Sequence, residues 1–332
     1  MPERVVVIGS NSFSGSHFVD RALRDGCEVV GISRSQEPHP VFLPYRWPTE
    51  RPAGRFTFHQ LDLNRDLDAI MGVVNAFQPD HVVNFAAQSM VAESWQQPDQ
   101  WMTTNVVATV RLHEGLRRCS FLKKYVHVST PEVYGTCEGL IPERTVYNPS
   151  TPYGVSRAAA DLSLMTFFKT YGFPVAFTRA ANVYGPGQQL YRIIPRAVLF
   201  FLTGRKLQLQ GGGRSVRSFI HIRDVAEATL RVARAGQPGE IFHLSTTTNI
   251  SVRALVEMIA ERMGVRFEDC VEIIADRPGK DAAYLLDSAR AKERLGWEAR
   301  ISLEAGIEDT IAWVARHREE ILAHPLDYVH KP

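Results

Sequence analysis

The chain of 332 residues is long enough for one large domain or two of ordinary size, and its 45% hydrophobic and 22% charged residues are those of an ordinary globular protein. The formal net charge of +2 excludes a strongly basic protein of the kind that binds nucleic acid or an anionic membrane, so neither partner is expected. We expect a cytoplasmic protein for three reasons. The four cysteines are scattered, no leader is expected before the first apolar segment, and no apolar run approaches the roughly 20 residues of a membrane span.

The first half of the chain alternates short apolar segments with longer helical patterns. Six segments are nearly continuous in apolar residues, as expected of strands covered on both faces: 4–9, 27–33, 56–63, 81–87, 124–130 and 174–183. Helical patterns lie between them, most clearly over 99–118 and 153–172. Repeated strand–helix–strand units predict an α/β fold with a Rossmann-type doubly wound parallel sheet.

The rhythm changes after residue 184, where the second part of the sequence begins. This part predicts helices and short strands, at 193–203, 206–213, 251–264, 271–276, 288–295 and 303–321. We expect an NAD(P)-binding domain over 1–183, with a return segment at 220–247, and a smaller C-terminal substrate-binding domain, mainly 184–332, over the carboxyl ends of the strands. The proline-rich segment 37–54 predicts a surface loop.

The turn between the first strand and the first helix predicts a dinucleotide site. Gly9 and Gly15 stand where backbone N–H groups can cradle a pyrophosphate, and Asn11, Ser12 and Phe13 lie between them. The usual glycine spacing would place a third glycine at position 12, where this chain has serine. We expect all five residues to contact the cofactor.

The end of the second strand bears on which dinucleotide is bound. An acidic residue there would accept hydrogen bonds from an adenosine ribose and repel a 2′-phosphate, but this chain has Arg34 between two serines. A guanidinium suits a phosphate, so the sequence favours NADP, with NAD as the alternative. Asp62 and Leu63, after the third strand, are placed to meet the adenine.

A second group of residues predicts proton chemistry on a hydroxyl. Tyr153 begins a helix and Arg157 follows one turn later on the same face, so the cation can lower the pKa of the tyrosine towards neutrality. Thr130 ends the fifth strand and can hydrogen-bond the same substrate hydroxyl. The eleven histidines show no HxxxH or HExxH spacing, so we expect no metal site.

At this point the chain resembles the extended short-chain dehydrogenase/reductases that modify nucleotide sugars, and within them the nucleotide-diphosphate-hexose 4,6-dehydratases of the dTDP-glucose and GDP-mannose types. Seven segments carry the resemblance in order: GSNSFSG, NFAAQSMVAES, VSTPEVYG, TPYGVSRAAAD, TRAANVYGPGQ, RSVRSFIHIRDVA and RPGKDAAYLLDSARAKERLGW. Three residues depart from the family pattern. Ser12 replaces a glycine, Pro131 replaces the aspartate of the dTDP-glucose type, and Arg157 replaces the usual lysine.

The resemblance implies a role for each catalytic residue. Tyr153 takes the proton of the sugar 4-hydroxyl while C4 gives its hydride to the nicotinamide, and Thr130 holds that oxygen. Arg157 supplies the positive charge. Glu132 then removes the C5 proton, water leaves from C6, and hydride returns to C6 while C5 is reprotonated. Pro131 cannot protonate the departing hydroxyl, so Glu132 carries its proton there or acts through water.

The resemblance also implies cofactor and substrate contacts outside this group. Ala86, Ala87 and Gln88 are expected to contact the cofactor together with Tyr153 and Arg157. The residues expected to contact a nucleotide-diphosphate sugar are Ser89, Asn182, Arg192, Arg217 and Arg277. Relatives pair the helices that correspond to 99–118 and 153–171 across a two-fold axis, so we expect a homodimer through these helices. The nucleotide base stays open, because the motifs mix features of both dehydratase types.

Other functions remain possible on the same scaffold. A nucleotide-sugar 4-epimerase has no need of Glu132, whereas an NDP-uronate decarboxylase, which loses C6 as carbon dioxide, could share the Thr-x-Glu pattern. The three departures also leave room for an NADP-binding relative without catalytic activity.

Overall fold

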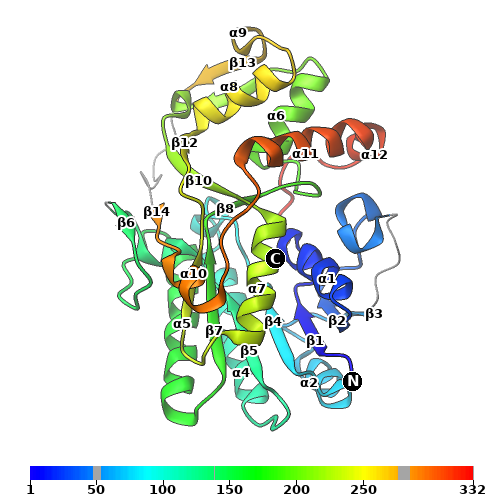
Figure 1. The fold of residues 1–332 in the computed structure, drawn as a ribbon, viewed down its shortest axis with the longest axis vertical. Coiled ribbons are helices and arrows are strands. Elements are labelled where there is room, and N and C mark those ends of the chain that lie inside the picture. The colour runs from blue at the N-terminus through cyan, green and yellow to red at the C-terminus, as the bar shows by residue number, and fades with distance from the viewer. Residues whose placement is uncertain (48–53, 138, 276–284, 332) are drawn as a thin grey trace.

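The computed structural model describes residues 1–47, 54–137, 139–275 and 285–331, and its centre is a seven-stranded parallel sheet. The strand order is β11–β7–β5–β4–β1–β2–β3. The strands are β1 (Arg4–Ile8), β2 (Glu28–Ser33), β3 (Arg55–Gln60), β4 (His81–Asn84), β5 (Lys124–Val128), β7 (Val175–Ala180) and β11 (Ile241–Leu244). The predicted doubly wound α/β fold is therefore confirmed (Figure 1).

Helices cover both faces of this sheet, which explains why its strands are so apolar. In β1, Val5 and Val7 pack into one hydrophobic cluster while Val6 and Ile8 pack into another on the opposite face. The helices of the first face are α1 (Phe13–Arg24), α7 (Ile222–Ala235) and α10 (Ala289–Leu295). Those of the second are α2 (Leu67–Phe77), α4 (Thr109–Leu116) and α5 (Pro152–Tyr171).

Two predicted elements are interrupted in the structure. The helix expected over 99–118 consists of α3 (Pro98–Met102), a π-helical stretch η4 (Thr103–Ala108) and α4. The strand expected over 174–183 ends at Ala180, and the chain then enters the separate strand β8 (Asn182–Tyr184). Apolar periodicity does not distinguish a π-turn from an α-turn, nor a strand that changes sheets from one that continues.

The smaller lobe lies beyond the carboxyl ends of the main strands (Figure 1). Its strands form the sheet β12 (Asn249–Ser251), β10 (Val216–His221) and β8, and the pair β9 (Leu207–Gln210) and β13 (Val271–Ile274). Its helices are α6 (Ile193–Leu202), α8 (Val252–Arg262), α9 (Phe267–Cys270), α11 (Leu303–Arg316) and α12 (Arg318–Leu322). Between these elements the chain returns to the main sheet through α7 and β11, and a short pair joins β6 (Leu140–Ile141) to β14 (Leu285–Leu286). The expected boundary between the two domains, after residue 183, stays a prediction.

The proline-rich segment is not the surface loop that we expected. Its described part forms two 3-10 turns, η1 (Pro40–Phe42) and η2 (Pro44–Arg46), and residues 48–53 lie outside the described chain. Val41 and Leu43 are only 2% and 1% exposed, and the indole nitrogen of Trp313 donates a hydrogen bond to the Val41 carbonyl at 3.3 Å. The prolines do form turns, but the apolar residues between them pack against the smaller lobe instead of facing solvent.

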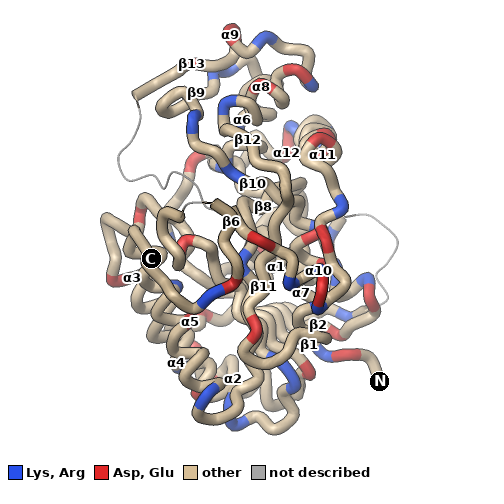
Figure 2. The backbone as a smooth tube through the Cα atoms, turned by 60° about the vertical axis from the view of Figure 1, so that its left-hand side comes forward, with Lys and Arg blue, Asp and Glu red and all other residues tan. Residues whose placement is uncertain are grey.

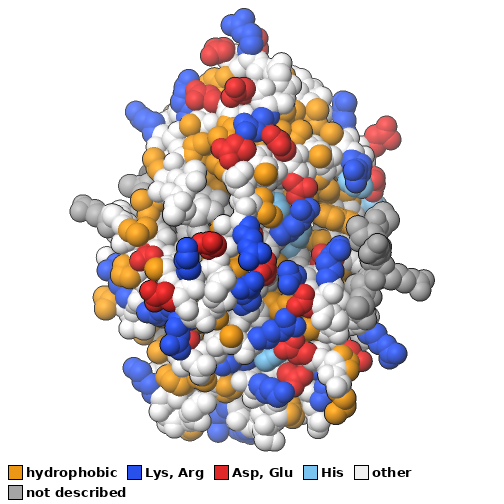
Figure 3. All heavy atoms as spheres, in the orientation of Figure 1, with side chains coloured by type: hydrophobic (Ala, Val, Ile, Leu, Met, Phe, Trp, Pro, Cys, Tyr) orange, Lys and Arg blue, Asp and Glu red, His pale blue; other side chains and the backbone are white. Residues whose placement is uncertain are grey.

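The surface carries charges of both signs in mixture. On the face shown in Figure 3, basic and acidic side chains are interspersed, in keeping with the net charge of +2. None of the helices in the described part of the chain combines the length and apolar composition that a membrane crossing needs.

Candidate active site

The glycine turn after β1 is shaped by two close backbone approaches. A Cβ atom added to Gly9 would lie 2.6 Å from the Ala86 backbone nitrogen, and one added to Gly15 would lie 2.2 Å from the Gly9 carbonyl oxygen. Gly9 also has a φ of +82°, which a larger residue rarely adopts. Both glycines are therefore required for α1 to begin close to the sheet and point its free N–H groups into the space beyond β1.

Ser12 has its own function in this turn. Its hydroxyl accepts a hydrogen bond from the Gly15 backbone nitrogen at 3.0 Å and donates one to the Gly9 carbonyl at 2.7 Å. Serine is among the best N-cap residues because its oxygen satisfies an otherwise unpaired N–H group at the start of a helix. The departure from the glycine pattern thus leaves the turn intact.

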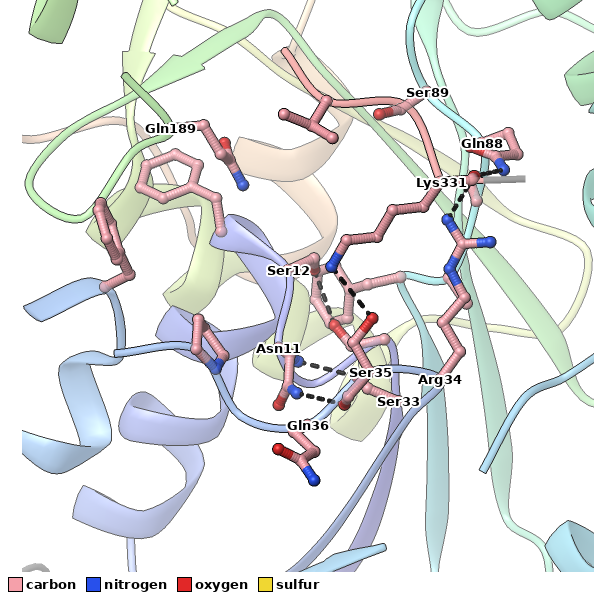
Figure 4. A pocket seen from close by; sticks show the side chains of 18 of the residues that line it. Asn11, Ser12, Ser33, Arg34, Ser35, Gln36, Gln88, Ser89, Gln189 and Lys331 are labelled. Carbon is pink, nitrogen blue, oxygen red and sulfur yellow. Dashed lines mark hydrogen bonds between the residues drawn. The ribbon is translucent and has the colours of Figure 1, made fainter. Parts of the chain in front are cut away.

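A cavity of about 500 Å³ opens in front of this turn, a size typical of small-molecule sites. Most of the predicted cofactor residues line it, as does the predicted substrate residue Ser89: Gly9, Asn11, Ser12, Phe13, Arg34, Asp62, Leu63, Ala86, Ala87, Gln88 and Ser89. Gly15 lies behind the turn, and Tyr153 and Arg157 lie outside the cavity lining. Figure 4 shows side chains from the glycine turn, the end of β2 and the β4 loop converging on this space.

The two serines beside Arg34 have different environments. The Ser33 hydroxyl is buried and accepts a hydrogen bond from the Asn11 backbone nitrogen at 3.0 Å, so it connects β2 to the glycine turn. Ser35 is half-buried and lines the cavity, while its carbonyl accepts from the Asn11 side-chain amide at 3.0 Å. Arg34 therefore shares the cavity wall with both neighbouring serines, of which Ser33 is the more deeply buried.

The sequence interpretation missed one whole wall of the cavity. The segment after α12 contributes to the lining, through His324, Pro325, Asp327, Tyr328, Val329 and Lys331. The Lys331 carbonyl accepts hydrogen bonds from Arg34 Nη2 at 2.9 Å and from Gln88 Nε2 at 2.8 Å. The alternation of apolar or aromatic residues in HPLDYVHK could have indicated an extended packed segment, but nothing in it points to a partner so far away in the chain.

Behind the cavity, the π-helical stretch connects the β4 loop to α5. Asn105 is fully buried, and its side-chain amide exchanges two hydrogen bonds with the backbone of Gln88, at 2.8 and 2.9 Å. The same amide nitrogen donates to the Ser156 hydroxyl at 2.9 Å. π-turns inside helices often occur at functional sites, and this one fixes the predicted cofactor residue Gln88 relative to the helix that carries Tyr153.

Tyr153 and Thr130 meet where β5 ends and α5 begins. Pro152 occupies the first turn of α5, and the Thr151 hydroxyl caps the helix by accepting from the Gly154 backbone nitrogen at 3.0 Å. The side chains of Thr130 and Tyr153 are hydrogen-bonded to each other. The structure therefore brings together the two residues that we expected to share one substrate hydroxyl.

The pKa of Tyr153 differs from our expectation. Burial raises this pKa above the usual value near 10, and the negative charge of Glu132 acts in the same direction. The positive charge of Arg157, the hydrogen bond with Thr130 and the charge of Arg192 lower the pKa, as predicted for Arg157, but they do not outweigh the burial. In the protein alone, Tyr153 is therefore protonated at neutral pH.

Arg157 is held by two residues at the end of β5. Its Nη2 donates to the Val128 carbonyl and lies 3.2 Å from Nε2 of His127, and the side chain is only 2% exposed. Burial, and then the charge of Arg157, hold the pKa of His127 well below its usual value, so the imidazole is neutral and can accept a hydrogen bond. The sequence interpretation did not include His127.

The four residues from Thr130 onwards explain the placement of Glu132. Pro131 is buried and opens the 3-10 helix η5 (Pro131–Tyr134), while the Thr130 hydroxyl caps that helix by accepting from the Glu132 backbone nitrogen at 3.3 Å. Glu132 is half-buried and close enough to Tyr153 for its charge to act on the pKa of the phenol. Proline fits the first helical position, where the chain needs no N–H donor.

The predicted substrate residues do not all converge. Arg192 begins α6, is exposed, and lies close enough for its charge to act on Tyr153. The Asn182 side-chain nitrogen donates to the Ser218 carbonyl at 3.1 Å within the small sheet, and Arg217 Nη1 donates to the Val216 carbonyl at 2.8 Å. Arg277 lies outside the described residues. The structure thus brings Arg192 towards the catalytic residues and does not test the other three.

Within the described chain, no three or more His, Cys, Asp or Glu residues are grouped so as to hold a metal ion.

Comparisons with known proteins cover almost the whole chain. The family model described as GDP-mannose 4,6 dehydratase matches residues 6–310. A dTDP-glucose 4,6-dehydratase from Streptomyces antibioticus is 33% identical over 324 residues, which span 95% of this chain and 93% of that protein.

Solved structures give the same result. A dTDP-glucose 4,6-dehydratase from Streptomyces venezuelae with NAD and TYD bound has a TM-score of 0.85 at 31% identity, over 96% of this chain and 98% of the other. A UDP-glucose 4-epimerase from Thermotoga maritima with UDP-glucose has a TM-score of 0.85 at 27% identity, over 95% and 99% of the two chains.

Proposed function

This chain belongs to the GDP-mannose 4,6 dehydratase family, within the extended short-chain dehydrogenase/reductases, and from that membership we propose how its site converts a nucleotide-diphosphate hexose to the 4-keto-6-deoxy sugar. Full-length similarity to a curated 4,6-dehydratase confirms the predicted reaction class. The observation that carries the proposal is the meeting of Thr130, Glu132, Tyr153 and Arg157 between the end of β5 and the first turns of α5.

A nicotinamide dinucleotide fits the cavity beside these residues. The glycines at 9 and 15 let the start of α1 approach the sheet closely, and the N-terminus of α1 faces the cavity, which favours a pyrophosphate. Gly9, Asn11, Ser12 and Phe13 would hold the pyrophosphate, and Asp62 and Leu63 the adenine. When bound, this cofactor would accept the hydride from C4 of the sugar and return it to C6.

The protein residues then perform the proton transfers. Tyr153, oriented by Thr130, removes the proton of the 4-hydroxyl, and Arg157 stabilises the phenolate that this role requires. Glu132 removes the C5 proton that the new C4 ketone makes acidic. Because Pro131 has no proton to give, Glu132 delivers that proton to the departing C6 hydroxyl or acts through a water molecule. As the hydride returns to C6, C5 takes up a proton that comes from solvent.

We propose NADP as the preferred cofactor and NAD as the alternative. The Streptomyces venezuelae relative was solved with NAD, which supports a nicotinamide cofactor and favours NAD over NADP. In this chain, however, β2 is followed by Arg34 and Ser35 at the cavity wall, and no carboxylate stands there to repel a 2′-phosphate. Titrating both cofactors by calorimetry tests this choice, and equal affinities would contradict it.

We also propose a cytoplasmic homodimer. Val107 in η4 and Val155 and Leu162 in α5 are 45%, 43% and 50% exposed, so the two predicted interface helices present apolar side chains to solvent. The four cysteines are free, which supports a reducing compartment.

The second candidate function is a 4-epimerase, favoured by the similar fold of the Thermotoga maritima enzyme. One experiment separates the candidates, including the uronate decarboxylase. The protein is incubated with NADP or NAD and a panel of UDP-, dTDP-, GDP- and CDP-hexoses and hexuronates, and the products are weighed by mass spectrometry. A dehydratase removes one water, an epimerase leaves the mass unchanged, and a decarboxylase removes carbon dioxide. A protein that binds cofactor and changes no sugar would support the non-catalytic alternative.

A further inference from the structure

Lys, Arg, Asp and Glu residues recur along the chain in both lobes (Figure 2), but in the described part only Asp161 and Arg179 are 0% exposed. Arg179 Nη2 donates to Asp161 Oδ2 at 2.7 Å, which joins β7 to α5 inside the protein. Taking two charges out of water costs about as much free energy as their attraction returns, so such a pair is weak evidence for a gain in stability. The residues that it contacts are the better indication of its function.

The Asp161 end of the pair is bonded to the strand end that carries Thr130. The same oxygen, Oδ2, accepts a second hydrogen bond from the Ser129 hydroxyl at 2.7 Å. Ser129 directly precedes Thr130, and its backbone nitrogen donates to the Thr178 carbonyl of β7 at 2.8 Å. Because α5 also carries Tyr153, this bond fixes the end of β5 relative to the helix, and with it the two residues that act on the sugar 4-hydroxyl.

The Arg179 end of the pair is bonded to η5, which carries Glu132. Arg179 Nη1 donates to the hydroxyl of Tyr134, the last residue of η5, which is 1% exposed. That hydroxyl lies 2.8 Å from Nε2 of His243 in β11. Burial lowers the pKa of His243 to about 3, and its Nδ1 lies 3.1 Å from the Asp287 carbonyl, so Nδ1 carries the proton and Nε2 accepts. The Tyr134 hydroxyl thus accepts on one side and donates on the other, which fixes η5 on the main sheet.

The second oxygen of Asp161 approaches the group that holds Arg157. Oδ1 has no hydrogen-bond partner and lies 3.6 Å from Nε2 of His127, which in turn lies 3.2 Å from Arg157 Nη2. The carboxylate is therefore bonded to one buried guanidinium and lies next to the acceptor of the other. Its negative charge offsets the repulsion between these two cations, which the protein interior screens less than water does.

We propose that the Asp161–Arg179 pair is a positioning element of the reaction, which places Thr130 for the oxidation of C4 and Glu132 for the removal of the C5 proton. The assignment rests on the catalytic roles proposed above and extends them to two residues that are too deeply buried to touch the sugar. They act through Ser129 at one end and through Tyr134 at the other.

Removing one hydroxyl at a time separates the two ends of the pair. Ser129→Ala breaks the bond between Asp161 and the residue beside Thr130, so C4 oxidation should slow roughly tenfold, without accumulation of reduced cofactor. Tyr134→Phe breaks the bond between Arg179 and η5, so C4 oxidation should keep its rate while the removal of the C5 proton slows roughly tenfold. Reduced cofactor should therefore accumulate in this variant alone.

Tyr147→Phe is the matched control for Tyr134→Phe. The Tyr147 hydroxyl also accepts from Arg179, at 2.6 Å from Nη2, but Tyr147 lies in the segment between β6 and α5 and not on η5. Its loss removes the same kind of bond from the same guanidinium, so both steps should stay within about twofold of the wild-type rates.

A double variant tests the pair itself. Asp161→Leu together with Arg179→Met removes both charges at similar volume, a change that leaves many proteins about as stable as before. It should bind the cofactor as the wild type does while both steps slow by about tenfold or more. A thermal melt and calorimetric titration with the dinucleotide check that it is folded, and if it is not, the single hydroxyl variants decide the question alone.

Stopped-flow absorbance at the nicotinamide band follows C4 oxidation, and mass spectrometry follows the loss of water, with the sugar from the panel that the wild type dehydrates. The assignment would be overturned if Ser129→Ala and Tyr134→Phe slowed the same step, or if neither differed from Tyr147→Phe. Normal rates in a folded double variant would overturn it as well. In each case wild-type turnover would leave the proposed function standing, whereas a wild type that dehydrates no sugar would overturn both.

Discussion

Arg157 and His127 are in contact inside the protein, with 3.2 Å between the guanidinium Nη2 and the imidazole Nε2 and with both side chains nearly fully buried. A guanidinium has more donors than the ammonium of the lysine that is usual in the family, and His127 and the Val128 carbonyl satisfy part of this excess. The neutral imidazole thereby fixes the position of the charge that acts on Tyr153.

We therefore expect His127 to act as a positioning residue. His127→Leu should lower kcat roughly tenfold with little change in KM, because Arg157 loses one of its two buried acceptors while the sugar contacts are unchanged. His127→Gln restores an acceptor and should recover most of the rate. Steady-state kinetics with a thermal melt of each variant checks this. Two variants that are equally slow, or equally unstable, would indicate a role in packing instead.

Glu132→Gln should separate the two halves of the reaction. Removing one positioned general base typically costs about 10²–10⁴-fold in rate, whereas Tyr153, Thr130 and Arg157 remain able to oxidise C4. Reduced cofactor should therefore accumulate at the nicotinamide absorbance band when the right sugar is supplied.

Heavy water provides the complementary measurement on the wild-type protein. The 4-keto-6-deoxy product should carry deuterium at C5 if Glu132 exchanges its proton with solvent. A product without that deuterium, together with normal turnover by Glu132→Gln, would make the carboxylate structural.

Removing the charge of Arg157 should shift the pH dependence of C4 oxidation upwards. The positive charge lowers the pKa of Tyr153, so Arg157→Met raises that pKa and less phenolate forms at a given pH. The rising limb of the rate should move to higher pH by about one unit or more. Arg157→Lys keeps the charge and should keep the profile close to that of the wild type. The initial rate of cofactor reduction at several pH values measures both, and identical profiles for the Met and Lys variants would refute the electrostatic role.

Buried neutral histidines should make the protein lose stability in mild acid. Burial lowers the pKa of His17 and of His243 to about 3 and that of His113 to about 4, against 6.5 when unfolded. At pH values between the folded pKa and 6.5, these histidines are protonated in the unfolded chain but neutral in the folded one. The free energy of unfolding is therefore highest above pH 6.5 and decreases as the pH falls. We expect a loss of about 1 kcal/mol per histidine at about pH 5.5.

Urea unfolding at about pH 7.5 and 5.5 measures this loss. His113→Leu should reduce the difference between the two pH values, because one proton-binding site of the unfolded chain is removed. Equal stability at both pH values would show that other groups compensate.

Leu162→Glu should dissociate the proposed dimer. Leu162 is the most exposed of the three apolar residues on the predicted interface helices, and a buried unpaired carboxylate there would oppose association. Analytical ultracentrifugation should show a monomer for this variant and a dimer for the wild type. Ile273→Glu replaces another exposed apolar residue, in β13 of the smaller lobe, and should leave the dimer intact. A wild-type monomer at micromolar concentration would contradict the proposal.

Patterns that repeat within a few residues could be interpreted from the sequence. Val5 to Ile8 are all apolar because both faces of β1 are covered, and that run alone indicates a central parallel strand. The meeting of Thr130 and Tyr153 follows from the carboxyl end of one strand and the start of the next helix, together with the resemblance to a known family.

Contacts between distant segments could not be predicted in this way. Gln88 and Lys331 are 243 residues apart, and His127 and Arg157 meet only because β5 and α5 pack together. The burial of Val41 depends on the smaller lobe. The burial of Tyr153 raises its pKa, whereas the sequence predicted a lowered pKa. Each of these depends on the complete fold, which local periodicity does not contain.

The position of β11 has a consequence for any attempt to prepare the N-terminal half by itself. β11 pairs with β7 at the outer edge of the main sheet, although residues 181–240 lie between them in the chain. A fragment that stops at residue 183 would leave those backbone N–H and C=O groups of β7 that face β11 without partners, and would expose the apolar surface that α7 covers. An unpaired, flat, apolar edge strand recruits strands from other molecules. Such a fragment would aggregate, and the fold is therefore completed only when the later part of the chain has been synthesised.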